Sequence, residues 1–100
     1  SIKYKQVEFM ESVIGREFSG IVSGVTEWGI FVEITETQCE GMVRLSDLND
    51  DYYIFEPEEF RVIGQHHKRT ITLGDDLIIK VVKTDINRRT IDLELVEKVR

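Results

Sequence analysis

The sequence of 100 residues has a single cysteine, no long apolar run and fewer cationic than anionic side chains. Cys39 has no partner for an intrachain disulfide, which is typical of a reducing compartment, and we expect a cytoplasmic location. No run approaches the ~18 apolar residues that a membrane span needs, and no signal peptide opens the chain, so we expect no membrane contact. Because the chain begins at Ser1 and not at a methionine, we expect it to be a fragment of a longer protein.

Groupings of side chains that are typical of catalysis or metal binding are also missing. His66 and His67 are adjacent and diverge in an extended chain, and the cysteine is remote, which does not fit a zinc site. The acidic pairs at 50–51 and 58–59 have no nucleophile or base beside them and are typical of solvated loops. No phosphate-binding glycine loop is present. The sequence therefore predicts no catalytic residue, no metal ligand and no cofactor in this chain.

Positive charge is scarce overall but is concentrated in the last third of the chain. The formal net charge is −6, whereas a nucleic-acid-binding domain is more often basic. Residues 1–65 carry five cationic and thirteen anionic side chains, a net −8, and residues 66–100 carry eight and six, a net +2. A local basic surface on an acidic body still binds phosphates, with weaker affinity and strong salt sensitivity.

Apolar residues at a period of two predict five strands, at 18–26, 29–34, 40–45, 76–85 and 90–95. Gly20 and Gly24 interrupt the first strand, which favours bulges or tight coiling, as in a small barrel. Residues 49–73 are rich in aromatic side chains and are predicted to be a folded insertion with a small hairpin. Since no helices alternate with these strands, we predict an all-β fold, a five-stranded Greek-key barrel of the OB type.

The first fifteen residues have a different period. Val7, Met10 and Val13 or Ile14 lie at helical spacing, and Gly15 is a natural left-handed stop. We therefore predict a short amphipathic helix at residues 4–14 that packs on another surface. The chain divides into a helical segment at 1–14 and a barrel domain at 15–97.

Three segments follow one another in an order and spacing that identify a family. They are GREFSGIVSGVTEWGIFVEI, EGMVRLSDL and LGDDLIIKVVKTDINRRTIDLEL. Together they resemble the S1 RNA-binding domain from about residue 15 to residue 96. The insertion, with DDYYIFE and TLGD, is similar to that of the S1 domain of bacterial ribonuclease R, and residues 5–20 are similar to the junction that precedes it in that enzyme.

This resemblance implies a function and partners. The chain would be the RNA-gripping module of a processive 3′-to-5′ exoribonuclease. It would bind single-stranded RNA, contact the catalytic domain of the same parent chain, and act as a monomer. Metal-binding aspartates carry out hydrolysis in the catalytic domain of such enzymes, where Mg²⁺ is the expected cofactor. No part of this chain resembles that domain.

Two aromatic residues are candidates for base stacking. In VTEWGIFVEI, the alternation of Ile30, Val32 and Ile34 leaves Phe31 on the outer face beside a glutamate. An exposed ring there offers a platform for a base. In the S1 family the positions that match Trp28 and Phe31 stack on bases, and the intervening glycine lets both rings reach one surface. The alternative for Trp28 is a core position at the mouth of the barrel.

Arg44 is the first cationic candidate. It lies on the outer face of the third strand, where the family commonly has a histidine that contacts RNA. Its guanidinium offers both a phosphate fork and a stacking plane. The alternative is a surface arginine paired with Glu40 or Asp47.

The other charged candidates lie around the last turn. Arg88 and Arg89 precede the fifth strand, and Asp85 opens the turn. The family has an aspartate and a basic residue here, and we expect Asp85 to orient Arg89, to accept from a base edge, or to cap its own turn. Lys83 and Lys80 diverge in a regular strand, so we favour Lys83, the nearer to the turn, as a phosphate contact.

These residues predict binding of single-stranded RNA with little sequence preference, through Trp28, Phe31, Arg44, Lys83, Asp85, Arg88 and Arg89. Two other functions remain open. An acidic barrel could instead dock on a protein and contact RNA little. An oligosaccharide-binding OB fold would share the aromatic platform but would not need the arginines.

Overall fold

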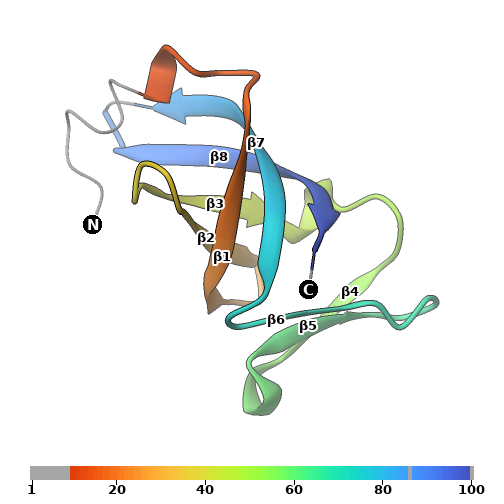
Figure 1. Ribbon diagram of the computed structural model, residues 1–100. Helices are drawn as coiled ribbons and strands as arrows, with labels where there is room; N and C mark the ends of the chain where they lie inside the picture. Colours follow the sequence, from red (N-terminus) through yellow and green to blue (C-terminus); the bar gives the residue numbers. More distant parts are fainter. Residues whose placement is uncertain (1–9, 86, 100) are drawn as a thin grey trace.

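The computed structural model describes residues 10–85 and 87–99. Figure 1 shows a closed barrel with a small second sheet at one end. Around the barrel the strands follow the order β1 (Glu17–Val25), β2 (Gly29–Ile34), β3 (Glu40–Arg44), β8 (Thr90–Lys98) and β7 (Asp76–Asp85). The predicted all-β, five-stranded barrel is confirmed, and its last strand is three residues longer than the sequence pattern indicated.

The strand β1 pairs antiparallel with both β2 and β7, and so joins the two halves of the barrel. The pairs β2–β3 and β7–β8 are also antiparallel. The barrel closes where β3 and β8 meet as parallel neighbours, with Met42 opposite Asp92. We call this closing pair the β3–β8 seam. It brings together segments that lie far apart in the chain.

The barrel core consists of alternate residues of the five strands, as a period of two requires. The buried barrel side chains are Phe18, Val22, Ile30, Val32, Ile34, Val43, Leu77, Ile79, Val81, Ile91 and Leu93. The residues between them point outward, so the register across the barrel decides which outer side chains lie together.

Three bulges modify that register; one skips Val96 of β8, and the other two lie in β1 and β7. In β1 the pairing skips Ser23, so that Gly24 lies opposite Phe31. In β7 it skips Val82, so that Lys83 lies opposite Asp92 while Lys80 lies opposite Glu94. The bulge in β1 falls beside Gly24, one of the two glycines that predicted it. The bulge in β7 places both lysines on the outer face of this strand, where a regular strand would separate them.

The insertion between β3 and β7 contains more than the predicted small hairpin. It forms an antiparallel sheet of β4 (Tyr53–Glu56), β5 (Arg61–Gly64) and β6 (Thr70–Thr72). Two short 3₁₀ turns, η1 (Leu45–Asp47) and η2 (Pro57–Glu59), accompany it. Thr70–Thr72 has only one apolar residue, too few to show a period, which explains why the third strand was not predicted.

Asp51 joins the start of β4 to the turn between β5 and β6. Its carboxylate accepts hydrogen bonds from the backbone N–H groups of Tyr52 (2.7 Å), His66 (3.0 Å) and His67 (2.7 Å). It also lies against Gly64, where a Cβ atom would overlap the carboxylate and displace it. Partial desolvation raises the pKa of Asp51, but the hydrogen bonds from His67, His66 and Tyr52 together outweigh it and hold this pKa below its ordinary value.

A second polar cluster in the insertion involves Tyr53, Asp50 and Arg69. The Tyr53 hydroxyl donates to Asp50 Oδ2 (3.0 Å), and Arg69 Nη1 lies 3.5 Å from the same oxygen. Burial of the phenol, together with the hydrogen bond to Asp50, raises the pKa of Tyr53 to about 12. Arg69 therefore has a partner within the insertion.

The described part of the N-terminal segment packs on the barrel. Met10 and Val13 are buried in the same cluster as the barrel core, and Gly15 has φ +93°, the left-handed conformation expected of a stop. The Gly15 N–H donates to Val81 O (2.7 Å). Met10 and Glu11 are helical, residues 12–15 form a turn toward β1, and the part of the predicted helix before residue 10 lies outside the described residues. Nowhere in residues 10–85 and 87–99 is there a helix long and apolar enough to span a membrane.

We expect the β3–β8 seam to be intolerant of a side chain at Gly41. A Cβ atom there would lie 2.8 Å from Leu93 Cδ1 and 2.9 Å from Ile91 O, so the strands would have to separate. Gly41→Ala should lower the free energy of unfolding by about 1–3 kcal/mol. Gly24→Ala is the matched control, since its Cβ would meet nothing closer than 3.4 Å. Equal urea midpoints for both variants would contradict the expectation.

Asp51 should make stability depend on pH. Because its pKa is lower in the folded chain, folding stabilises the ionised form, and this contribution is full above the ordinary pKa of 3.8. It is lost as the pH falls through the lower, folded-state pKa. The difference in Tm between the wild type and Asp51→Asn should therefore be constant near neutral pH and shrink below about pH 4. A difference that is unchanged in acid would show that the charge of Asp51 does not contribute.

Candidate nucleic-acid interface

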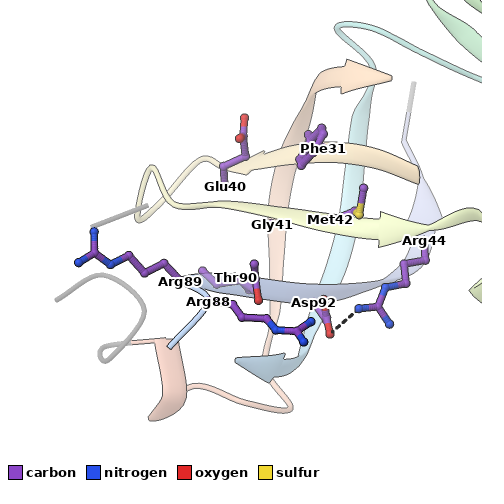
Figure 2. A pocket seen from close by; sticks show the side chains of 10 residues that line it. Phe31, Glu40, Gly41, Met42, Arg44, Arg88, Arg89, Thr90 and Asp92 are labelled. Carbon is purple, nitrogen blue, oxygen red and sulfur yellow. Dashed lines mark hydrogen bonds and ion pairs between the residues drawn. The ribbon is translucent and has the colours of Figure 1, made fainter. Parts of the chain in front are cut away.

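A groove of about 540 Å³ crosses the outer face of β2, β3 and β8 and reaches the turn before β8. Figure 2 shows its lining. The side chains and backbone that line it belong to Phe31, Glu40, Gly41, Met42, Arg44, Arg88, Arg89, Thr90, Ile91 and Asp92. Four of the seven predicted site residues are among them: one aromatic residue and all three arginines. We call this feature the β2–β3–β8 groove.

The strand register arranges a row of side chains across the groove. Phe31 pairs with Met42, Met42 with Asp92, and Asp92 with Lys83. Directly paired residues point to the same side of a sheet, so these four side chains lie side by side on the outer face. The row begins on β2, inside the groove, and ends on β7, just beyond it.

Phe31 is half-exposed at the start of this row. Its neighbour across the strands is Gly24, and a Cβ atom there would be 3.4 Å from Phe31 Cδ2. The glycine thus leaves the ring uncovered on the side of β1. The Phe31 ring lies on the same outer face as Glu33 because it lines a surface groove. No second layer from the described part of the protein covers it.

Arg44 lies at the β3 end of the groove and pairs with Asp92. The distance from Arg44 Nη2 to Asp92 Oδ2 is 3.5 Å, and the arginine side chain remains 57% exposed against 22% for the aspartate. The alternative prediction, that Arg44 pairs with Glu40 or Asp47, was wrong. The true partner is 48 residues away in sequence and becomes a neighbour only through the β3–β8 seam.

The turn before β8 supplies the other two arginines. In Figure 2, Arg88 extends along the groove and Arg89 extends outward past its end. Asp85 Oδ1 accepts a hydrogen bond from the Arg88 N–H (3.1 Å), and Asp85 Oδ2 lies 4.0 Å from Arg88 Nε. Asp85 thus caps its own turn and contacts Arg88 where we expected Arg89. It does not line the groove.

Trp28 and Lys83 lie beside the groove and do not line it. Trp28 is 71% exposed, so the alternative that it fills the mouth of the barrel was wrong. It lies in the tight β1–β2 turn, where Thr26 Oγ1 accepts from the N–H groups of Trp28 and Gly29. The turn meets the Arg44 end of the groove, because Gly29 pairs with Arg44. Lys83 is exposed beside Asp92.

Met42, Asp92 and Glu40 line the groove but were not predicted as site residues. The period of two in each strand indicates that Met42 lies on the same outer face as Arg44 and that Asp92 also points away from the core. This was the sequence signal that could have identified them. What the sequence did not reveal is that the two residues are neighbours. Glu40 Oε2 accepts a hydrogen bond from the Ser23 hydroxyl (2.7 Å), which holds this carboxylate toward β1.

The charge that lines the groove differs from that of the whole chain. Three arginines and two carboxylates, Glu40 and Asp92, give the lining a formal net charge of +1, on a chain of net −6. The groove is thus a cationic region of an acidic domain. Within residues 10–85 and 87–99 there is no cluster of three or more histidine, cysteine or acidic side chains that could hold a metal ion.

The family model of the S1 RNA-binding domain matches residues 13–95. The chain belongs to the S1 RNA-binding domain family. Ribonuclease R of Ureaplasma parvum is 41% identical over 92 residues, which are 92% of this chain and 13% of that protein. Ribonuclease R of Aquifex aeolicus is 36% identical over 98 residues, 98% of this chain and 14% of that protein. This S1 domain therefore spans less than one sixth of the length of these relatives.

Solved structures show the same similarity. RNase R of Mycoplasma genitalium, in its apo form, superposes with a TM-score of 0.88 at 29% identity, over 93% of this S1 domain and 14% of that chain. The same enzyme in complex with ribose-methylated single-stranded RNA gives the same TM-score and coverage. The predicted resemblance to the S1 domain of ribonuclease R is confirmed.

The exposure of Trp28 leads to a prediction in solution. Because the indole of the only tryptophan is largely in contact with water, its emission maximum in the folded domain should lie close to that of the urea-unfolded chain. A neutral collisional quencher such as acrylamide should quench both states to a similar extent. A blue-shifted emission that is protected from acrylamide would show that the indole is covered.

Proposed function

We propose that this S1 domain binds single-stranded RNA in the β2–β3–β8 groove with little sequence preference. The observation that carries this proposal is that one half-exposed aromatic ring and three guanidinium groups line the same groove. The single-stranded RNA complex of the Mycoplasma genitalium enzyme, whose S1 region shares this fold, supports it. RNA would be held by one stacked base and by contacts to several phosphates.

Each element of the groove has a separate task in this proposal. The Phe31 ring stacks on a base, an interaction of about 1–3 kcal/mol per base. Arg44, Arg88 and Arg89 donate to phosphate oxygens, and a guanidinium does so through two parallel N–H groups. Neighbouring strands lie ~4.8 Å apart, so the row from Phe31 to Lys83 spans about 14 Å. Lys83 then contacts a phosphate beyond the groove.

These contacts do not distinguish one base from another. Every base has a face that stacks, and every nucleotide has a phosphate, so binding depends on backbone charge and not on base edges. Since the groove has a net charge of only +1, we propose that the isolated domain binds weakly. The affinity of the parent protein would come from several such modules acting on one strand. Nanomolar affinity of the isolated domain at physiological salt would contradict this.

We further propose a role in a larger enzyme. The relatives in which this domain occupies 13–14% of the length are ribonucleases R. We infer that the parent protein is a cytoplasmic hydrolytic 3′-to-5′ exoribonuclease, with its catalytic residues and Mg²⁺ in a domain outside this chain. The S1 domain would act as a monomeric module beside that domain and hold substrate for it.

The test is a titration with an oligoadenylate of about 12 nucleotides, followed by the fluorescence of Trp28 at two salt concentrations. Phe31→Ala should weaken binding by roughly 5- to 150-fold, the loss of one stacked base. Phe60→Ala is the matched control, because Phe60 is an exposed aromatic residue between η2 and β5, outside the groove. Arg44→Ala should weaken binding and flatten its salt dependence, whereas Arg61→Ala, whose guanidinium pairs with Glu56, should do neither.

Other outcomes identify the rival functions. Saturable binding whose affinity depends neither on salt nor on the arginine substitutions would indicate a neutral ligand such as an oligosaccharide. If the Trp28 fluorescence does not change on addition of RNA at low salt, and the protein is shown to be folded, the domain is a protein-docking module. Equal losses for Phe31→Ala and Phe60→Ala would place RNA elsewhere on the domain.

A further inference from the structure

Asp92 is one of two carboxylates that line the groove beside three arginines and an aromatic ring. Its neighbours in the row are Met42 on one side and Lys83 on the other, and Arg44 Nη2 lies 3.5 Å from its Oδ2. Its side chain is 22% exposed and lines the groove. It therefore lies between two of the cations that the proposed function assigns to RNA phosphates.

The position of Asp92 is not explained by the stability of the fold. Its side chain is on the outside of the barrel, and its partner Arg44 is more than half exposed. Ion pairs this exposed contribute little to stability, because water screens them. The second carboxylate of the groove differs, because Glu40 is held toward β1 by the Ser23 hydroxyl.

We propose that Asp92 is a built-in competitor of RNA for Arg44, which lowers the affinity of the groove. This inference rests on the proposed function. The N–H of Arg44 Nη2 that faces Asp92 can reach a phosphate only after this contact is broken or shared. The negative charge of Asp92 also repels the same phosphate. RNA is then held loosely at the centre of the groove, as suits a module that must let a strand slide through.

The substitution that tests this is Asp92→Asn, which keeps the size of the side chain and removes its charge. Binding of the oligoadenylate should tighten by about fivefold at low salt, the effect of one unit charge a few ångströms from a phosphate in water. The slope of log Kd against log salt should become steeper by up to ~0.7, because Arg44 is free to make a full phosphate contact. The Tm should stay close to that of the wild type.

Glu94→Gln is the matched control. Glu94 is two residues away on the same strand and face, opposite Lys80, and does not line the groove. Glu94→Gln changes the net charge by the same amount as Asp92→Asn. An equal gain in RNA affinity in both variants would show that only the overall charge matters and would overturn the inference. In the Arg44→Ala background, Asp92→Asn should have a smaller effect, because no guanidinium is released.

The remaining outcomes are distinct from a failure of the proposed function. If the wild type binds RNA and Asp92→Asn binds it equally or more weakly, Asp92 is not a competitor. Weaker binding would mark it as an acceptor for a base amino group or a ribose hydroxyl. If neither the wild type nor Asp92→Asn binds RNA, the proposed function fails and this inference fails with it.

Discussion

The parallel contact between β3 and β8 is the constraint on which the rest of the domain depends. It closes the barrel, and it does so at close range, because Gly41 has no side chain and its backbone approaches Leu93 and Ile91. The same contact places Arg44 beside Asp92 and opens the groove on the outside. The same strand pairing therefore closes the barrel core and forms the candidate site.

Two of the three bulges in the barrel then decide which outer side chains lie together. A strand that alternates perfectly would separate Lys80 from Lys83 and would shift Gly24 away from Phe31. The skipped residues Ser23 and Val82 alter the register without disturbing the inward row of apolar side chains. Local irregularity thus sets the composition of the outer surface, while the core remains regular.

The inserted sheet packs on the barrel through apolar side chains and is held together by polar contacts of its own. Val62 and Ile71 extend the barrel core into it, while the carboxylate of Asp51 joins the start of β4 to the β5–β6 turn through backbone hydrogen bonds. Its two arginines are paired within it, Arg61 with Glu56 and Arg69 with Asp50. Arg44, Arg88 and Arg89, which come from separate elements, converge on the groove, so positive charge is not spread evenly over the domain.

The amino-acid sequence alone determined the strand content, the inward residues and the outward position of Phe31, because all three follow from a local period of two. It also determined the family, through motifs in a fixed order. The strand Thr70–Thr72 was too short to show a period, and the partner of Arg44 could not be predicted, because Asp92 is 48 residues away. The exposure of Trp28 was likewise left open. Only the tertiary structure decided these points, because strand register and barrel closure are long-range properties that no local pattern encodes.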